Sequence, residues 1–515
     1  MKKNRFTKAF CIMIAAAMLV PAAGCKKEQE SNNGNIKLKW IFPGPGEQKD
    51  SQQVWAEFNN KIKEFPGLEN VDVEIECINT SDYKQRVLLM QTGDEKYDIL
   101  STYSLNFANE IDNKALMPLD DLMKSENVDC INELPDWIIN MGQKNGKTYA
   151  VISYQAMTRA DPGIVMPTSL FDKYVDRDKL EEAFYNTNFY DEDNWQAIGD
   201  ILQKMKDNGD LGLGYLNAGA IEPACNGYDY VGGNIVSGGF YTKLGEPDGQ
   251  MYYVAELPEY KTAAKYLNDW YKKGFIRQDI LSVDTNTDKK GTGGYTIFQG
   301  GVDGFGSQER SFKKQYGEDF TAVRSRKYNY VLPTAAGGGL AISVGCEHPQ
   351  EAMRVIDVLS SEKGKELYNL MLYGIEGVQY DKVSDGIIKL KDGAGTSSSD
   401  SYGQYHWVVG NSKLSYELES EKGRKQYTYE VANEGPDTIV SDFMGFIPDI
   451  SSVITEITRI NSLYDEYSKT LAKGATADFE ALYNEYMQKL QTAGIEKVRE
   501  CVQKQAKEFL AAKNK

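Results

Sequence analysis

Hydrophobic side chains in residues 36–100 follow two periodicities in turn. Residues 36–42 and 71–75 alternate apolar and polar positions, which is typical of β-strands, and residues 97–100 form a third short apolar run. The segments between them, from about 50 to 65 and from about 81 to 92, are predicted to be helical. The apolar positions of the first helix are Val54, Trp55, Phe58, Ile62 and Phe65. This order predicts βαβ units and a largely parallel sheet.

The carboxyl edge of this sheet is the expected ligand-binding edge, because parallel α/β sheets bind ligands beyond the ends of their strands. Residues 43–47 (Pro-Gly-Pro-Gly-Glu) follow the first strand, and residues 101–103 (Ser-Thr-Tyr) follow the third. Glycine allows the backbone to approach a ligand, and tyrosine combines a flat apolar face with a hydroxyl group. A plain turn at 43–46 is the alternative interpretation.

The rest of the chain shows the same two kinds of pattern. Strands are expected at 146–152, 297–301 and 340–344, and helices at about 193–206, 259–273, 349–359 and 361–373. Residues 383–401 are rich in Asp, Gly and Ser and predict a surface excursion. The chain after residue 446 is predicted to be helical, with apolar stripes at Val453, Ile457, Ile460, Tyr464 and Leu471 and at Phe479, Leu482, Tyr486 and Leu490.

The N-terminus has the features of an export signal. Four basic residues precede an uncharged run from 9 to 24, and Cys25 follows directly. The run is shorter than the roughly 20 residues of a membrane-spanning helix. The segment resembles the lipobox of bacterial lipoproteins, although Ala22 stands where that box prefers Leu. We expect residues 1–24 to be a signal peptide, Cys25 to be lipidated and residues 25–35 to be a polar tether; an ordinary secretory peptide is the alternative.

The length and charge of the chain indicate its domain organisation and exclude some classes of binding partner. A chain of 515 residues suggests two domains with a helical extension. Without the four basic residues of the signal, 54 Lys and Arg stand against 75 Asp and Glu, a formal charge of −21. Such an acidic chain is not expected to bind nucleic acid, which relies on basic residues, or to adhere to anionic lipid except through a covalent anchor.

Cysteine and histidine are too few for most catalytic or metal-binding chemistry. Beyond the signal, five cysteines remain at irregular spacing, so at least one stays unpaired and no zinc site is indicated. His348 and His406 are the only histidines, and neither lies near a G-x-S-x-G motif. Asp284, Asn286 and Asp288 do not continue as a calcium loop. No catalytic residue, metal or cofactor is predicted.

Four segments together carry a resemblance to a known family. They are the signal with Cys25, residues 257–279 (including LPEYK and WYKKGFI), residues 341–380 (including His348-Pro349 and Tyr373-Gly-Ile-Glu-Gly377), and residues 490–495. In this order the chain resembles extracellular solute-binding lipoproteins of ABC importers, of the family 1-like class that takes up carbohydrates. It departs at Val378-Gln379, where relatives often have a basic residue and histidine.

The resemblance implies an α/β periplasmic-binding-protein-like fold of type II, with two lobes, hinge strands and a helical C-terminal extension. We assign 36–153 plus about 285–335 to lobe 1 and 154–284 plus about 336–440 to lobe 2. Residues 441–515 would form a helical segment that packs across the lobes. The implied partners are a small-molecule solute, most plausibly an oligosaccharide, the ABC permease subunits, and the extracellular face of the membrane through Cys25. The protein is expected to be monomeric.

Loop residues beside glycine or aromatic neighbours are the candidates for ligand binding. They are Glu47, Tyr103, Tyr154, Gln299, Glu376, Tyr405 and Trp407. Aromatic rings with carboxylates and amides alongside suit the apolar faces and polar rims of sugars. A surface glycoside hydrolase with paired carboxylates, a peptide-binding lipoprotein and an adhesin are the competing functions; among 75 acidic residues a suitable pair would occur by chance.

Overall fold

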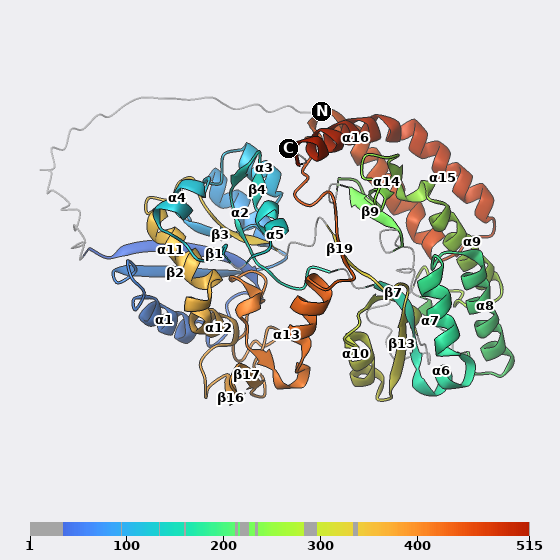
Figure 1. Ribbon diagram of the computed structural model, residues 1–515, viewed down its shortest axis with the longest axis horizontal. Coiled ribbons are helices and arrows are strands. Elements are labelled where there is room, and N and C mark those ends of the chain that lie inside the picture. Colours follow the sequence, from blue (N-terminus) through green and yellow to red (C-terminus); the bar gives the residue numbers. More distant parts are fainter. Residues whose placement is uncertain are drawn as a thin grey trace, which may run out of the picture.

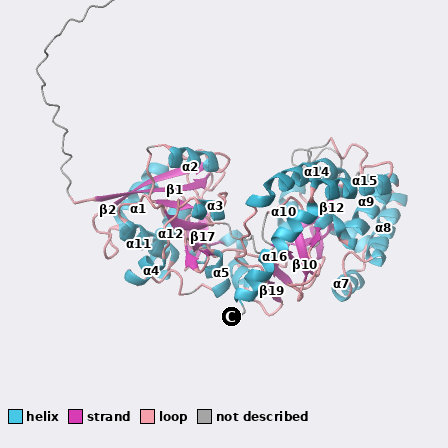
Figure 2. Cartoon of the chain, turned by 90° about the horizontal axis from the view of Figure 1, so that it is seen from above, coloured by secondary structure: helices cyan, strands magenta, loops and turns pink. Residues whose placement is uncertain are grey.

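The chain forms two lobes that lie side by side and are joined in the middle (Figures 1 and 2). The computed structural model describes residues 34–93, 95–132, 134–158, 161–211, 215–216, 226–231, 235–282, 296–332 and 338–513. The predicted signal peptide and Cys25 lie outside these residues, as does most of the predicted tether. Among the described residues, no helix combines the length and the apolar character needed to span a membrane.

The first lobe is built on a five-stranded sheet in the order β2-β1-β3-β15-β6. Its strands are β1 (Ile36–Gly44), β2 (Val71–Asn79), β3 (Ile99–Ser101), β6 (Val151–Ile152) and β15 (Gly339–Ile342). β1 pairs in parallel with β2 and β3, as the sequence pattern predicts. β15 is antiparallel to β3 and β6. The chain returns from the other lobe and therefore enters the sheet at the end where β3 and β6 leave it.

Helices cover both faces of this sheet because successive side chains of a strand point to opposite faces. Trp40 and Phe42 belong to the core under one set of helices, whereas Ile41 belongs to the core on the other face. The first set is α1 (Ser51–Ile62), α4 (Asp120–Ser125), α11 (Pro349–Ser360) and α12 (Lys365–Tyr373), and the second is α2 (Tyr83–Thr92), α3 (Phe107–Asp112) and α5 (Asp136–Met141). Two small sheets complete the lobe: β4 (Gln143–Lys144) with β5 (Lys147–Thr148), and β16 (Tyr380–Ser384), β17 (Ile387–Leu390) and β18 (Glu417–Leu418).

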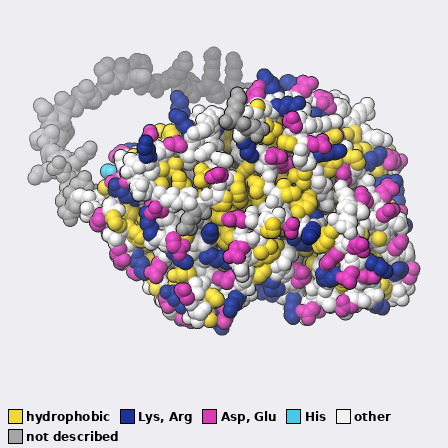
Figure 3. All heavy atoms as spheres, viewed as in Figure 1, with side chains coloured by type: hydrophobic (Ala, Val, Ile, Leu, Met, Phe, Trp, Pro, Cys, Tyr) yellow, Lys and Arg dark blue, Asp and Glu magenta, His cyan; other side chains and the backbone are white. Residues whose placement is uncertain are grey.

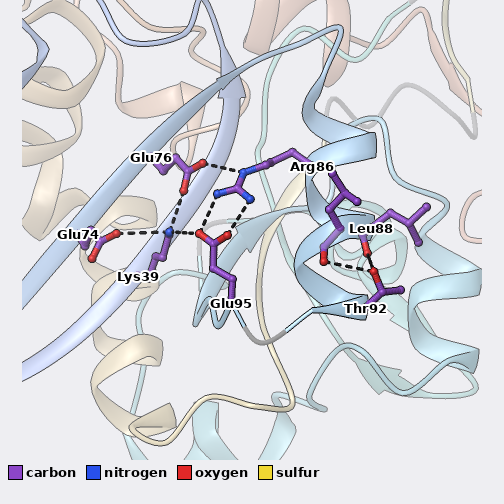
Figure 4. Close-up of polar contacts among 8 residues, drawn as sticks. Lys39, Glu74, Glu76, Arg86, Leu88, Thr92 and Glu95 are labelled. Atoms are coloured by element: carbon purple, nitrogen blue, oxygen red, sulfur yellow. Dashed lines mark hydrogen bonds and ion pairs between the residues drawn. The ribbon is translucent and has the colours of Figure 1, made fainter. Parts of the chain in front are cut away.

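An ion network ties α2 and the following connection to the strands of the first lobe (Figure 4). Lys39 on β1 contacts Glu74 at 3.4 Å, Glu76 at 2.8 Å and Glu95 at 2.7 Å. Arg86 on α2 contacts Glu76 at 3.1 Å and Glu95 at 2.7 Å. Hydrogen bonds from Arg86 and then Lys39 lower the pKa of Glu95 to about 2. The ionised network therefore holds the connection that leads into β3 against the sheet.

Replacing Glu95 with glutamine is expected to reduce the loss of stability in acid. The folded state lowers the pKa of Glu95, so its contribution is fully present above the pKa of the unfolded chain, about 4.3, and is lost as the pH falls toward about 2. Thermal unfolding between pH 2 and 7 should show a lower Tm for the variant at pH 7 and a flatter pH profile. Glu64→Gln, at an exposed position without a described side-chain partner, should keep the wild-type profile; parallel profiles for wild type and Glu95→Gln would contradict the prediction.

The second lobe contains a mixed sheet and a smaller antiparallel sheet. The mixed sheet has the order β13-β7-β12-β8 and the smaller one the order β11-β10-β9. The strands are β7 (Asp161–Pro167), β8 (Tyr215–Leu216), β12 (Thr296–Val302), β13 (Phe320–Arg324), β9 (Tyr228–Val231), β10 (Phe240–Lys243) and β11 (Tyr252–Tyr253). The helices are α6 (Thr168–Tyr174), α7 (Arg177–Asn186), α8 (Glu192–Asp207), α9 (Pro258–Lys272) and α10 (Ser307–Tyr316). The predicted helices at 193–206 and 259–273 are thus confirmed, and Trp195 of α8 stacks on Trp270 of α9 with ring centroids 5.2 Å apart.

Three long helices complete the second lobe: α14 (Ile454–Ala472), α15 (Phe479–Ala493) and α16 (Ile495–Lys513). Their apolar stripes pack against β9–β11 and α9 in one core, in which Ile457, Ile460 and Leu490 are buried. The helices were predicted, and the packing of residues 441–515 across the lobes stays a prediction. The three helices pack on the second lobe, whereas Met444, at the start of this segment, lies in a core of the first lobe. Their apolar faces are covered by the second lobe (Figure 1).

The predicted division of the chain between the lobes is reversed after residue 285. Residues 285–335 were assigned to lobe 1, but β12 and β13 both pair with β7 in lobe 2. Residues 336–440 were assigned to lobe 2, but β15 pairs with β3 and β6, and α11 and α12 pack into the core of lobe 1. Hydrophobic alternation identifies a strand without identifying its neighbours, so the sequence pattern could not decide which sheet each strand joins.

Within the described residues, three segments lead from one lobe to the other, as the implied hinge requires. They lie near residues 153–158, 325–332 and 427–441. Within them β14 (Asn329–Val331) pairs in parallel with β19 (Thr438–Val440), and Thr158 bridges to Val331. The short helix α13 (Arg424–Gln426) precedes the last crossing, which begins with η7 (Tyr427–Asn433), and α13 lies between the lobes (Figure 1). The Asn433 side chain donates to the Gln155 carbonyl at 2.6 Å and accepts from the Met157 backbone N–H at 3.0 Å.

Candidate binding site

The carboxyl edge of the first sheet gathers the loops that the sequence pattern places there. Thr102, after β3, donates its N–H to the Gly339 carbonyl at 2.8 Å, and Ser153, after β6, donates to the Gly338 carbonyl at 3.1 Å. Thr80, after β2, donates to the Gly44 carbonyl at the end of β1 at 3.1 Å. Parallel strands end at one edge, so these loops meet and face the hinge.

Residues 403–404, more than 300 residues further along the chain, pack against the same edge. Gln404 lies so near Gly44 that a Cβ atom at Gly44 would be 2.7 Å from the Gln404 Oε1 and 2.5 Å from the Cys77 Sγ. The Gln48 Oε1 accepts a hydrogen bond from the Gly403 N–H at 3.0 Å. A side chain at position 44 would have to displace Gln404 and Cys77, so this close approach favours glycine there.

A pocket of about 410 Å³ lies between this segment and helices α13 and η7, a volume in the range of small-molecule sites. Its wall combines tyrosine rings with hydroxyl, amide and charged groups. It is lined by Ala156, Leu372, Tyr373, Leu390, Gly395, Thr396, Ser397, Tyr402, Gly403, Gln404, His406, Ser412, Ser415, Tyr416, Glu417, Leu418, Glu421, Arg424, Lys425, Thr428 and Tyr429. This is the composition expected for binding a molecule with apolar faces and a polar rim.

His406 is a neutral hydrogen-bonding group in this pocket. Burial, together with the positive charge of Arg424, lowers the pKa of His406 to about 4. Its Nδ1 lies 2.9 Å from the Ser412 Oγ, which in turn lies 3.1 Å from the Ser153 Oγ at the end of β6. The neutral imidazole thus links the pocket to the carboxyl edge of the sheet.

Replacing His406 with asparagine is expected to remove a loss of stability at mildly acidic pH. The pKa of His406 in the folded protein is about 4, against about 6.5 in the unfolded chain, so the unfolded chain binds the additional proton between these values. Wild-type stability should decrease as the pH falls from about 6.5 to about 4, by on the order of 3 kcal/mol, and then level off. Denaturant unfolding at several pH values measures this slope. His348→Asn, at the N-cap of α11, is the control for removing a histidine and should retain the slope; a wild-type slope in His406→Asn would refute the assignment.

One wall of the pocket also contacts the second lobe. Arg424 donates from Nη1 to the Ser307 Oγ at 2.7 Å, at the start of α10. Tyr427 stacks on Phe305 with ring centroids 5.7 Å apart, and its hydroxyl accepts a hydrogen bond from the Gly304 N–H at 2.9 Å. Hydrophobic side chains gather over the middle of the face shown in Figure 3, where the lobes meet. A change in the position of α13 would therefore affect both the pocket and the contact between the lobes.

This two-lobed architecture agrees with a comparison of the sequence with protein families. Residues 46–366 match the model of the bacterial extracellular solute-binding protein family. The chain belongs to this family. A solute-binding protein carries its solute and is not an enzyme, so the glycoside hydrolase alternative is excluded. In this solute-binding protein, residues 442–511 also match a domain of unknown function, and they coincide with the region of α14 to α16.

Known proteins similar to this solute-binding protein extend over almost its whole length. A carbohydrate ABC transporter substrate-binding protein of Streptococcus pneumoniae serotype 4 is 23% identical over 530 residues, covering 100% of this chain and 99% of the relative. The crystal structure of an N-glycan transport solute binding protein from Streptococcus pneumoniae has a TM-score of 0.72 and 21% identity, covering 93% and 100% of the two chains. Its complex with Man5GlcNAc has a TM-score of 0.60 and 21% identity, covering 93% and 99%. The predicted two-lobed α/β fold of type II is thereby confirmed.

The candidate residues of this solute-binding protein fall in several environments. Tyr405 and Trp407 stack with ring centroids 4.8 Å apart and planes 10° from parallel, half-buried against the first core beside His406. Tyr103 is half-buried at the carboxyl edge, where a Cβ atom at Gly338 would lie 2.8 Å from it. Tyr103 therefore lies at the edge where the sequence pattern predicts it, and Tyr405 and Trp407 lie beside His406, but none of the three lines the pocket.

The other candidates lie elsewhere or are covered. Tyr154 is fully buried and donates its hydroxyl to Glu434, so its ring supports the hinge and is not exposed to a solute in this conformation. Glu47 is exposed and lines a separate groove of about 450 Å³ between α1 and β2. Glu376 is exposed and pairs with Lys382 of the β16–β17 hairpin at 3.1 Å. Gln299 lies in β12 opposite Gly163, in the second lobe, and its side chain is outside the described part of the structure.

The pocket contains functional candidates that the sequence reading missed. They are Tyr373, Gln404, His406, Tyr416, Arg424, Lys425 and Tyr429. Gln404 and His406 are sequence neighbours of Tyr405 and Trp407, the two residues that were chosen as candidates. The basic pair Arg424-Lys425 was a usable signal, because it follows an acidic stretch in an acidic chain. The described cysteines Cys77, Cys130, Cys346 and Cys501 are free thiols.

Proposed function

We propose that this protein captures an extracellular oligosaccharide and delivers it to an ABC permease. The observation that carries the proposal is the pocket at the carboxyl edge of the first lobe, one wall of which is bonded to the second lobe through Arg424 and Tyr427. Sugars present apolar C–H faces and polar rims, which match the tyrosine rings and the neutral hydrogen-bonding groups of the pocket. The similarity to a carbohydrate substrate-binding protein and to an N-glycan transport protein supports this solute class.

Closure of the lobes would couple solute binding to recognition by the permease. Binding shifts a protein toward the conformation that binds the ligand more tightly. In this chain α13 and η7 line the pocket and contact α10, so an occupied pocket would favour one arrangement of the lobes. A micromolar affinity corresponds to about −8 kcal/mol, which several ring contacts and hydrogen bonds can supply after the cost of ordering.

The proposal includes attachment to the outer face of the cell membrane through a lipid on Cys25. The basic head, the uncharged run and the polar segment after Cys25 support this arrangement. Expression with a clickable fatty acid should label the wild-type protein, and Cys25→Ser should lose the label and enter the medium. Equal labelling of both proteins would contradict lipidation at this residue.

A binding screen tests the function. Purified residues 26–515 would be mixed with a panel of oligosaccharides, and both the Tm and the length of the recovered sugar would be measured. The expected result is an increase in Tm with at least one oligosaccharide that is recovered intact. Absence of a shift across the panel, together with a shift by peptides, would overturn the oligosaccharide assignment.

A further inference from the structure

The solute pocket contains an ammonium group that is not neutralised by a carboxylate. Lys425 is half-buried, and its Nζ donates to the Ser415 carbonyl at 3.1 Å. Among the described residues, Lys425 forms no ion pair. The two carboxylates that line the pocket contact groups other than the Lys425 ammonium. Glu417 accepts a hydrogen bond from the Lys425 backbone N–H at 3.0 Å, and Glu421 lies 3.8 Å from Arg424.

The chain has 75 acidic residues against 58 basic ones, yet Lys425 has no carboxylate partner among the described residues. The buried arginines, by contrast, have carboxylate partners: Arg277 lies 2.5 Å from Asp279, Arg326 lies 2.6 Å from Asp161, and Arg499 lies 2.5 Å from Glu256. Transfer of an ammonium out of water is unfavourable unless it is paired. The fold therefore leaves an electrostatic penalty at Lys425 that an anionic group in the pocket would relieve.

Burial and the positive charges near Lys425 favour the binding of an anion beside it. Burial has the largest effect in lowering the pKa of the Lys425 ammonium. The positive charges of Lys365 on α12 and Lys413 in η5 (Ser412–Leu414) lower it further, against opposing effects of Glu362 and Glu417. Lys365 is already paired with Glu362 at 2.7 Å. Arg424, at the side of the pocket that faces the second lobe, adds another positive charge. A bound carboxylate would oppose these effects and favour the charged form of Lys425.

We propose that the pocket selects acidic saccharides, in which a sugar carboxylate pairs with the Lys425 ammonium. This inference rests on the proposed function and specifies its solute class. The ammonium is a compact charge that can pair with one carboxylate while it keeps its bond to the Ser415 carbonyl, because it has three donors. A hydroxyl of a neutral sugar would accept a hydrogen bond from Lys425 without neutralising its charge.

Matched pairs of sugars test this selectivity. Each pair consists of a neutral oligosaccharide ending in glucose and the same oligosaccharide ending in glucuronate, and calorimetry measures both affinities at low and at physiological salt. Wild type should bind the acidic member at least 10-fold more tightly, with a smaller difference at higher salt. In Lys425→Met and Lys425→Gln the preference for the acidic member should disappear, because its carboxylate loses the ammonium partner.

Lys473→Met is the matched control, because Lys473 also donates to a carbonyl, that of Ile280 at 3.0 Å, but lies in the second lobe outside the pocket. It should keep the wild-type preference. Equal or tighter binding of the neutral sugars by wild type would overturn the acidic selectivity and leave the oligosaccharide function standing. A preference that survives in both Lys425 variants would overturn the role of Lys425. If no sugar of either kind binds, the proposed function itself is refuted.

Discussion

Replacing Ser415 with tryptophan is expected to eliminate solute binding while the protein remains folded. Ser415 lines the pocket and is half-buried, and its hydroxyl has no described hydrogen-bond partner. An indole at this position would occupy a large part of a cavity of about 410 Å³ and exclude a sugar ring. The affinity should fall at least ~100-fold, which corresponds to about 2.7 kcal/mol. Calorimetry with the sugar identified in the screen measures the loss, and thermal unfolding shows whether the variant is folded.

The control for this substitution is Ser399→Trp, at an exposed position of the 383–401 excursion that does not line the pocket. It should bind as the wild type does. If Ser415→Trp binds the sugar with unchanged affinity, the solute occupies another part of the molecule, and the candidate site proposed above is wrong.

Replacing Gly474 with alanine is expected to destabilise the second lobe strongly. Gly474 adopts a left-handed conformation with φ of +65°, and a Cβ atom there would lie 2.2 Å from the Leu267 carbonyl oxygen of α9. The same turn is held by Asn268, which donates to the carbonyls of Gly474 at 2.7 Å and Thr476 at 2.6 Å. Backbone cannot move aside as a side chain can, so α14 and α15 would have to separate from α9. The free energy of unfolding should decrease by about 3 kcal/mol, from left-handed strain and overpacking together.

Gly317→Ala separates these two causes. Gly317 ends α10 with φ of +83°, but a Cβ atom there would meet no atom within 4 Å. It should therefore lose only the conformational part, about 1 kcal/mol. Denaturant unfolding of both variants gives the comparison, and equal losses would show that the contact between Gly474 and α9 does not hold the C-terminal helices in place.

The position of α13 and η7 gives the molecule a direct physical link between its pocket and its lobe arrangement. Arg424 and Tyr427 reach the second lobe, while Lys425 and Tyr429 are bonded to the first, through the carbonyls of Ser415 and Tyr154. Because the same short segment leads into the last hinge crossing, a solute that displaces it would act on the hinge itself. The proposed capture by lobe closure therefore has an identifiable element on which it acts.

Local patterns in the sequence were sufficient to predict most of the helices and strands. Alternation in residues 36–42 and 71–75 identified β1 and β2, and helical spacing identified α1, α8, α9, α14 and α15. Such periodicity is visible in sequence because each of these elements buries one face or one stripe, and the burial is repeated every two or about 3.6 residues. The same reasoning placed the proposed ligand-binding edge, since parallel strands end at one edge of the sheet.

Only the tertiary structure decides which sheet each strand joins and which residues line the pocket. Leu340 and Ile342 are apolar enough for either lobe, and only pairing with β3 and β6 places them in the first. Likewise, Gln404 meets Gly44, and Lys425 meets Ser415, because loops distant in sequence close over one sheet edge. Sequence periodicity records how much of a side chain is buried, whereas a binding site depends on which buried and exposed groups face one another.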